Sequence, residues 1–207
     1  MTAKLKKENQ MRVIAGIARG RRLKAPPGDT TRPVTDMIKE ALFNVWGQRV
    51  QGAAFLDLFA GSGSMGIEAL SRGAQTVIFV DNNARAVAVI KDNLQNCHIS
   101  EGFEVYRNDV FRAIDILQNR GAKFDIIYVD PPFTNEVIFD KVIKILDEAQ
   151  ILEQNGIMVI RTYKKKTLPV SLSNLSQYRK NDYGESVLHY YRSNEEVRLN
   201  DGDIQNS

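Results

Sequence analysis

The sequence has little of what disulfide-bonded, zinc-binding or membrane proteins contain: in 207 residues there is one cysteine and there are two histidines. Cys97 alone cannot form an internal disulfide or a cysteine-rich zinc site, so we expect no metal and a reducing, cytoplasmic location. No stretch approaches the roughly 18 consecutive apolar residues of a membrane span. Hydrophobic residues make up 43% and charged residues 26% of the chain, which excludes a disordered or fibrous protein.

The net charge of +3 is small, but the charge is unevenly distributed along the chain. Residues 1–24 hold eight basic residues and one acidic residue, a net charge of +7, which leaves −4 for the remainder. This asymmetry indicates that the N-terminal part meets an anionic partner. Residues 1–10 lack the apolar run of a secretion signal and are expected to form a flexible leader. Residues 194–207 are likewise expected to form a flexible tail.

From residue 53 onward, apolar segments of strand length alternate with segments of helical spacing. Strands are predicted at 53–59, 76–80, 103–107, 124–129 and 157–162, and helices at 64–72, 83–96, 110–119 and 135–149. Alternation of this kind is typical of a parallel sheet with helices on both faces. Residues 177–183 and 186–192 flank Gly184 and predict an antiparallel hairpin at the sheet edge. The expected fold of residues 51–193 is therefore α/β and Rossmann-like, with a mostly parallel seven-stranded sheet.

Residues 11–50 form a separate N-terminal extension in this interpretation. Residues 11–15 and 22–24 are predicted to form two short strands joined by a glycine-bearing turn, a small β-hairpin. Thr35 has the character of an N-cap, and a helix is expected from about residue 36 to residue 48.

A glycine-rich loop follows the first predicted strand, in the sequence Asp57-Leu58-Phe59-Ala60-Gly61-Ser62-Gly63. Glycines allow the backbone to approach a ligand closely, and ligands of doubly wound sheets bind at the carboxyl ends of strands. The carboxylate of Asp57 would repel a pyrophosphate but suits a ligand with a cationic amino or sulfonium group. We therefore expect S-adenosylmethionine rather than NAD, bound by Asp57, Phe59, Gly61, Ser62 and Gly63.

Two further acidic residues end the next two predicted strands. Asp81 is placed to accept hydrogen bonds from both ribose hydroxyls of a nucleoside, and Asp109 to accept one from an adenine amino group. The neighbouring Asn82 and Val110 are expected to contact the cofactor with them. The alternative is that Asp81 and Asp109 merely cap the helices that follow.

The sequence Asp130-Pro131-Pro132-Phe133 follows the predicted strand 124–129. The two prolines fix the backbone and remove its donors, so Asp130 and the carbonyl of Pro131 form a rigid pair of acceptors. Such a pair suits a planar NH₂ group, and the ring of Phe133 offers a face on which a base can stack. The arrangement predicts methyl transfer to an exocyclic amine, although Asp-Pro is also a common turn opener.

Taken together, these motifs resemble a known family. The loop at 57–63 and Asp130–Phe133 are similar to those of class I amino-methyltransferases. The RsmD-type 16S ribosomal RNA guanine-N2 methyltransferases are the family that the chain resembles over about residues 11–192. The resemblance rests on GIARGRRL at 16–23, RPVTD at 32–36, KEALFN at 39–44 and GIEALSRGA at 66–74. Val34 is a departure, since the family usually carries threonine there.

The resemblance implies methylation of one guanine in 16S ribosomal RNA, with the 30S subunit or an assembly intermediate as substrate and the protein as a monomer. The residues expected to contact RNA are Arg19, Arg21, Arg22, Arg32, Thr35 and Lys39, of which the last three would line the pocket entrance. Lys164–Lys166 are a possible second phosphate contact. The alternative for these cations is a solvated charged face. Two other functions stay open: a DNA adenine-N6 methyltransferase and a non-catalytic RNA-binding assembly factor.

Overall fold

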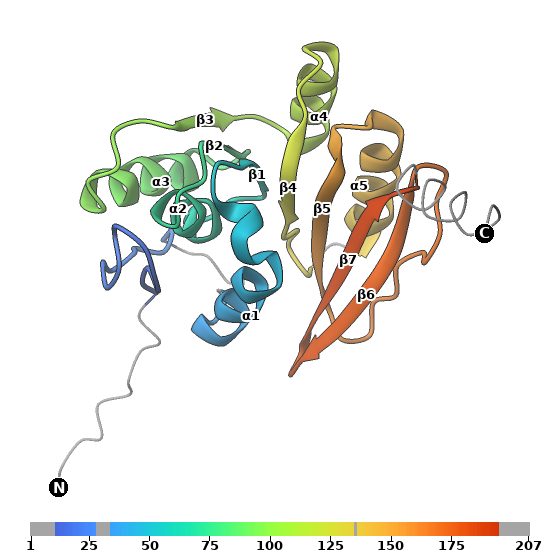
Figure 1. The fold of residues 1–207 in the computed structure, drawn as a ribbon, viewed down its shortest axis with the longest axis horizontal. Helices are drawn as coiled ribbons and strands as arrows, with labels where there is room; N and C mark the ends of the chain where they lie inside the picture. Colours follow the sequence, from blue (N-terminus) through green and yellow to red (C-terminus); the bar gives the residue numbers. More distant parts are fainter. Residues whose placement is uncertain (1–10, 28–33, 135, 195–207) are drawn as a thin grey trace, which may run out of the picture.

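The computed structural model describes residues 11–27, 34–134 and 136–194 and contains one seven-stranded sheet (Figure 1). The strand order is β3-β2-β1-β4-β5-β7-β6; the first five are parallel, and β7 and β6 are antiparallel. The strands are β1 (Ala54–Leu58), β2 (Thr76–Asp81), β3 (Phe103–Arg107), β4 (Phe124–Val129), β5 (Leu152–Tyr163), β6 (Leu175–Tyr183) and β7 (Ser186–Ser193). This is the Rossmann-like class I fold, and it confirms the predicted mostly parallel sheet with a C-terminal hairpin.

Five α-helices and one 3₁₀ helix accompany the strands within the described residues. They are α1 (Asp36–Trp46), η1 (Gly47–Val50), α2 (Ser64–Ser71), α3 (Ala84–Asn96), α4 (Val110–Asn119) and α5 (Glu136–Ala149). Two hydrophobic clusters lie on opposite faces of the sheet, because successive side chains of a strand alternate between faces. The first contains side chains of α1, α2 and α3, and the second contains those of α4 and α5.

Strand β5 begins earlier than the sequence pattern predicts. Its first part pairs with β4 through Leu152 and Phe124, and the register then shifts before Ile157 pairs with Ile126. The residues between them, Glu153 to Asn155, are polar and exposed, so they lack the apolar signal of a buried strand. The other predicted boundaries in the parallel sheet fall within two residues of those observed.

Helix α1 attaches the N-terminal extension to the sheet. It begins at the predicted N-cap, where the Thr35 hydroxyl oxygen accepts a hydrogen bond from the Ile38 N–H. Its last residue, Trp46, is 1% exposed and packs edge-on against Phe55 of β1, with 5.6 Å between the ring centroids. Such aromatic pairs add to the free energy of burial, so this contact fixes the helix on the sheet.

Residues 11–24 pair as a short antiparallel hairpin rather than as two regular strands. One isolated bridge joins Arg12 and Arg22, flanked by a hydrogen bond from Leu23 N–H to the Met11 carbonyl. The pairing does not lengthen, because the N–H groups of Ile14 and Ala15 donate instead to the side chain of Glu68 on α2.

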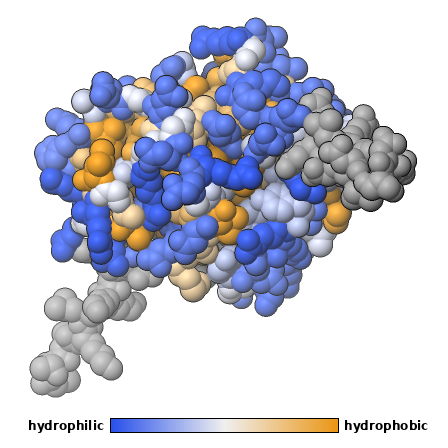
Figure 2. Space-filling model, viewed as in Figure 1, coloured by the Kyte–Doolittle hydropathy of each residue, from blue (hydrophilic) through white to orange (hydrophobic). Residues whose placement is uncertain are grey.

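The surface seen in Figure 2 is mostly hydrophilic, with smaller hydrophobic areas between the polar side chains. Among the described residues, no helix has the length and hydrophobicity that crossing a bilayer requires.

Candidate active site

The glycine loop turns the chain sharply between β1 and α2. Phe59 has φ 60°, which is uncommon for a residue with a side chain, and Gly61 and Gly63 have φ 54° and 74°. A Cβ on Gly63 would lie 3.1 Å from the side chain of Ile90 on α3. Non-glycine residues in the left-handed region cluster at ligand sites, so the loop has the backbone expected of one.

Asp57 lies at the carboxyl end of β1, beneath this loop. Its carboxylate is 2% exposed and accepts a hydrogen bond from the Gly66 N–H in α2, at 3.0 Å from Oδ2. Burial raises the pKa of Asp57 well above its ordinary value, while the Gly66 hydrogen bond opposes this shift and the nearby Asp130 adds to it. A cationic ligand would stabilise the ionised form of such a carboxylate, so the site fits the positively charged cofactor predicted from the sequence.

Asp81 supports the glycine loop from the neighbouring strand. Its Oδ2 accepts from the Gly61 N–H at 2.9 Å and its Oδ1 from the Asn83 N–H at 2.8 Å. Asp81 therefore fixes the loop directly. Its contact with ribose hydroxyls stays a prediction, and so does the cofactor contact of Asn82, which is exposed.

Asp109 is the N-cap of α4: its Oδ1 accepts hydrogen bonds from the N–H groups of Phe111 and Arg112. Asp109 thus caps the helix that follows, as the alternative interpretation of the sequence states, and its hydrogen bond to an adenine amino group stays a prediction. Val110 is 3% exposed and its side chain packs in the second hydrophobic cluster, so only its backbone is suited to a ligand contact.

Asp130 follows β4 directly, and the register of β1 with β4 brings it close to Asp57. A cavity of about 230 Å³ lies between them at the carboxyl ends of these strands. Its lining includes Met11, Ala25, Pro26 and Val34 of the extension, Asp57 and Phe59–Ser62 with Ser64 and Met65 of the loop region, and Tyr128, Asp130, Pro131, Phe133, Thr134 and Arg161. The predicted cofactor loop and the predicted amine-binding motif therefore share one cavity, although Gly63, Pro132, Asp81 and Asp109 do not line it.

Two residues of this cavity, Tyr128 and Arg161, were not predicted from the sequence. The Tyr128 hydroxyl donates to Asp130 Oδ2 at 3.2 Å, and Arg161 Nη1 donates to the same oxygen at 2.7 Å. The available signal for Arg161 was a charged residue directly after the apolar run 157–160, since buried charges are rare unless paired.

The N-terminal extension lines part of this cavity and is held in place by a buried carboxylate. Glu68 is fully buried, and its two oxygens accept from the N–H groups of Ile14 and Ala15 at 2.7 and 3.0 Å. Arg72 Nε donates to Glu68 at 2.8 Å, and Lys39 Nζ lies 3.5 Å from its other oxygen. Glu68, which was not among the predicted site residues, thus joins the extension to α2.

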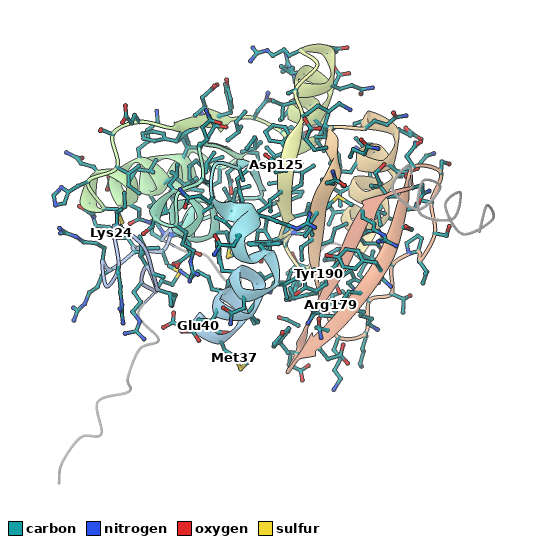
Figure 3. All side chains as sticks on the ribbon, in the orientation of Figure 1. Lys24, Met37, Glu40, Asp125, Arg179 and Tyr190 are labelled. Atoms are coloured by element: carbon teal, nitrogen blue, oxygen red, sulfur yellow. The ribbon has the colours of Figure 1, made fainter. Side chains whose placement is uncertain are left out.

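A second buried side chain links the extension to the glycine loop. Lys24 lies beside α3 (Figure 3), and its backbone N–H donates to the Asn93 amide oxygen at 2.9 Å. The Asn93 NH₂ group donates in turn to the carbonyls of Lys24 and Ser62, at 3.0 and 2.9 Å. The loop and the extension are therefore fixed to each other as well as to the catalytic fold.

The predicted RNA-contacting residues fall into different environments. Arg19, Arg21 and Arg22 are exposed in and after the turn of the N-terminal hairpin, next to Ile17, which is 85% exposed. Thr35 is the N-cap described above, and Arg32 lies outside the described residues.

The prediction that Lys39 lines the pocket entrance and contacts RNA is wrong. Its side chain is 2% exposed, and its ammonium donates to the Arg12 carbonyl at 2.6 Å beside Glu68. In the Lys164–Lys166 segment, Lys166 pairs with Asp140 at 2.8 Å.

Comparisons with known proteins agree with this geometry. The sequence pattern of the family described as "Conserved hypothetical protein 95" matches residues 11–192. A putative rRNA methyltransferase, YlbH, from Bacillus subtilis is 41% identical over 88% of this chain and 98% of its own length. The ribosomal RNA small subunit methyltransferase D of Haemophilus influenzae is 36% identical over 78% of this chain and 83% of its own. A solved structure of a putative methyltransferase, YhhF, from Escherichia coli is 30% identical with a TM-score of 0.74, covering 89% of this chain and 98% of that one.

These matches confirm both the family and the cofactor that the motifs predict. The names of the relatives are those of methyltransferases, and the buried Asp57 carboxylate under a left-handed glycine loop fits S-adenosylmethionine, a cationic methyl donor. With nearly the whole described chain matched and the two motifs in one cavity, the chain belongs to the RsmD-type ribosomal RNA methyltransferase family.

Proposed function

We propose that this protein transfers a methyl group from S-adenosylmethionine to the exocyclic N2 amine of one guanine in 16S ribosomal RNA. The proposed substrate is the 30S subunit or an assembly intermediate. The protein is proposed to act on it in the cytoplasm as a monomer. The observation that carries the proposal is the cavity shared by Asp57, the glycine loop and Asp130 to Phe133. The names of the relatives, which include small subunit methyltransferases, support ribosomal RNA as the substrate class.

The acceptors around Asp130 suit the chemistry of an aromatic amine. The nitrogen lone pair of such an amine is delocalised into the ring, so the amine is a poor nucleophile. Hydrogen bonds from its two N–H groups to the Asp130 carboxylate and the Pro131 carbonyl favour a tetrahedral nitrogen and stabilise the positive charge that develops on it. The cofactor supplies an electrophilic methyl group when bound, and Phe133 positions the base by stacking. Because the proton can leave after the transfer, Asp130 need not act as a general base.

The N-terminal extension, residues 11–50, is proposed to bind the RNA, and residues 51–193 to perform the reaction. Val13, Ala18 and Leu23 are buried, so the intervening arginines Arg19, Arg21 and Arg22 project from the surface. The hairpin that carries them contains or adjoins the extension residues that line the cavity, Met11, Ala25 and Pro26. Phosphates bound there would flank the cavity, and the target base would have to leave its stack to enter it.

The reaction is tested by incubating the full-length protein with labelled S-adenosylmethionine and three substrates: 30S particles, free 16S ribosomal RNA and duplex DNA. The proposal predicts label in N2-methylguanine of 16S ribosomal RNA, strongest with particles. Asp130→Ala should lower turnover roughly 10²-fold while cofactor binding, measured by calorimetry, stays near that of the wild type. Label in DNA N6-methyladenine would establish the adenine methyltransferase alternative instead, and cofactor-independent RNA binding without turnover would favour an assembly factor.

The RNA-binding surface is tested by the salt dependence of binding. Replacing Arg19, Arg21 and Arg22 by alanine should flatten the slope of log K against log salt by about 2, because each phosphate contact on single-stranded RNA contributes about 0.7. The matched control replaces three exposed cations on the α4 and α5 side, Arg120, Lys141 and Lys144. An equal change of slope in both triple variants would show that the hairpin makes no particular phosphate contacts.

A further inference from the structure

Arg161 is a buried cation that directly follows a buried apolar run in β5. Its side chain is 3% exposed, and the four residues before it, Ile157 to Ile160, are all buried. Transferring a charge from water into such surroundings is costly unless a partner of opposite charge and good geometry compensates it. The position of this arginine therefore requires an explanation beyond packing.

The pairing of β4 with β5 brings Arg161 beside the catalytic motif. Val129 is in register with Ile160, so the next residues along the two parallel strands, Asp130 and Arg161, are level with each other. Arg161 Nη1 donates to Asp130 Oδ2 at 2.7 Å, and the Tyr128 hydroxyl donates to the same oxygen at 3.2 Å. Two donors thus converge on one carboxylate oxygen.

The guanidinium is itself held in a fixed orientation. Arg161 Nε donates to the hydroxyl of Ser186 on β7 at 3.2 Å, and its central carbon lies 5.0 Å from the centre of the Phe133 ring. A planar guanidinium held at one edge by a hydroxyl and against an aromatic ring has little freedom to rotate. Its contact with Phe133 also ties it to the ring on which the base is proposed to stack.

The charges around Asp130 show what Arg161 compensates. Asp130 interacts electrostatically with Tyr128 on β4, with Arg161 on β5 and with Asp57 on β1. Burial raises the pKa of Tyr128, so its hydroxyl stays a donor, and the two carboxylates repel each other. Burial alone lowers the pKa of Arg161, but the Asp130 charge raises it above its ordinary value, so the guanidinium remains protonated.

We propose that Arg161 is a positioning residue for methyl transfer, which with Tyr128 keeps the Asp130 carboxylate ionised and oriented as a hydrogen-bond acceptor rather than a general base. A carboxylate oxygen that already accepts one strong hydrogen bond from a cation and a second from a hydroxyl is a poor base, yet the carboxylate retains the charge that stabilises a developing cation. The ion pair is neutral overall, so the cationic arginine can lie near the reacting amine without opposing the transfer. The role of Arg161 in catalysis rests on the function proposed above.

The first test measures Asp130 directly and needs no turnover. Carboxyl NMR titration of the full-length protein should show a higher Asp130 pKa in Arg161→Met than in the wild type, because the neighbouring positive charge is lost. Arg161→Lys should leave the pKa near that of the wild type, since the charge is kept. An unchanged Asp130 pKa in Arg161→Met would overturn the proposal, whether or not the protein methylates ribosomal RNA.

The second test uses the methylation assay and separates charge from orientation. Arg161→Met should lower kcat about 10²-fold and move the acidic limb of the kcat profile to higher pH, with KM for RNA and cofactor affinity nearly unchanged. Arg161→Lys should lower kcat about tenfold without moving the limb, because lysine cannot reproduce the planar geometry. Thr162→Val, on the same strand as Arg161, removes the buried hydrogen bond between Thr162 Oγ1 and His189 Nε2; it is the control for a merely structural role, and should change kcat less than threefold.

The possible outcomes distinguish the two proposals. A fall of kcat in Arg161→Met without a shift of the acidic limb would assign Arg161 a structural role only. A wild-type protein that binds S-adenosylmethionine but methylates no RNA would refute the proposed function, while the NMR titration would still report whether Arg161 controls the ionisation of Asp130.

Discussion

Replacing Glu68 by glutamine should destabilise the attachment of the N-terminal extension to α2. The two Glu68 oxygens accept from both Ile14 and Ala15, with Arg72 on one oxygen and Lys39 near the other. Glutamine has a single acceptor oxygen, so its NH₂ group must face one of the two backbone N–H groups. The substitution also leaves the buried Lys39 ammonium without a counter-ion.

The expected loss is about 3–5 kcal/mol, the usual cost of removing one partner from a buried ion pair. This is a large part of the roughly 5–15 kcal/mol that stabilises a typical domain. Urea unfolding of the full-length protein measures it, and amide exchange at Ile14 and Ala15 shows whether the loss is local. The control is Glu148→Gln, which breaks the exposed Lys144–Glu148 pair and should cost less than about 0.5 kcal/mol.

The pH dependence gives a second readout of the same contact. Burial lowers the pKa of Lys39, and Glu68 partly opposes this, so Glu68→Gln should lower that pKa further. Between the folded pKa and the ordinary 10.5, the unfolded chain binds more protons, so stability rises with pH. The deficit of the variant should therefore shrink above neutral pH. A loss below 1 kcal/mol, with unchanged amide protection, would refute the assigned role of Glu68.

Three further predictions concern Gly16, His189 and Asp57. Gly16→Ala should destabilise the protein more than Gly20→Ala, as measured by urea unfolding. Both glycines have positive φ, but only a Cβ on Gly16 would clash, at 1.7 Å from the Ser71 carbonyl oxygen. Equal losses of stability in the two variants would contradict this close approach. Burial lowers the pKa of His189 to about 4, so the free energy of unfolding should fall by about 3 kcal/mol as the pH drops from 6.5 to 4. His189→Asn should remove this pH dependence of stability, and an unchanged pH dependence in the variant would exclude His189 as its source. Asp57→Asn, which can still accept from Gly66, should weaken S-adenosylmethionine binding about 10–100-fold by calorimetry, and unaltered affinity would remove the Asp57 charge from the cofactor site.

Much of the fold was predictable because its signals are local. The parallel strands are short apolar runs between helices of clear period, and Thr35 carries its cap signal in one side chain. Strand β5 was predicted too short because its first part is polar, and it is held by pairing with β4 rather than by apolar periodicity.

The candidate site was predictable only where a motif is contiguous in sequence. The loop at 57–63 and the residues Asp130 to Phe133 are such motifs, and they meet in one cavity. Arg161 and Glu68 could not be assigned in this way, because their partners lie 31 and 54 residues away. Lys39 was misassigned for the same reason: a lysine on a helix near basic residues suggests a surface contact, and only the fold brings Glu68 to its ammonium.

The most direct test of the function is to map methylated guanines in ribosomal RNA from cells with and without this gene. The proposal predicts that one N2-methylguanine disappears from 16S ribosomal RNA and returns when the wild-type gene, but not the Asp130→Ala variant, is restored. An unchanged set of methylated guanines, or the loss of N6-methyladenine from DNA instead, would contradict it.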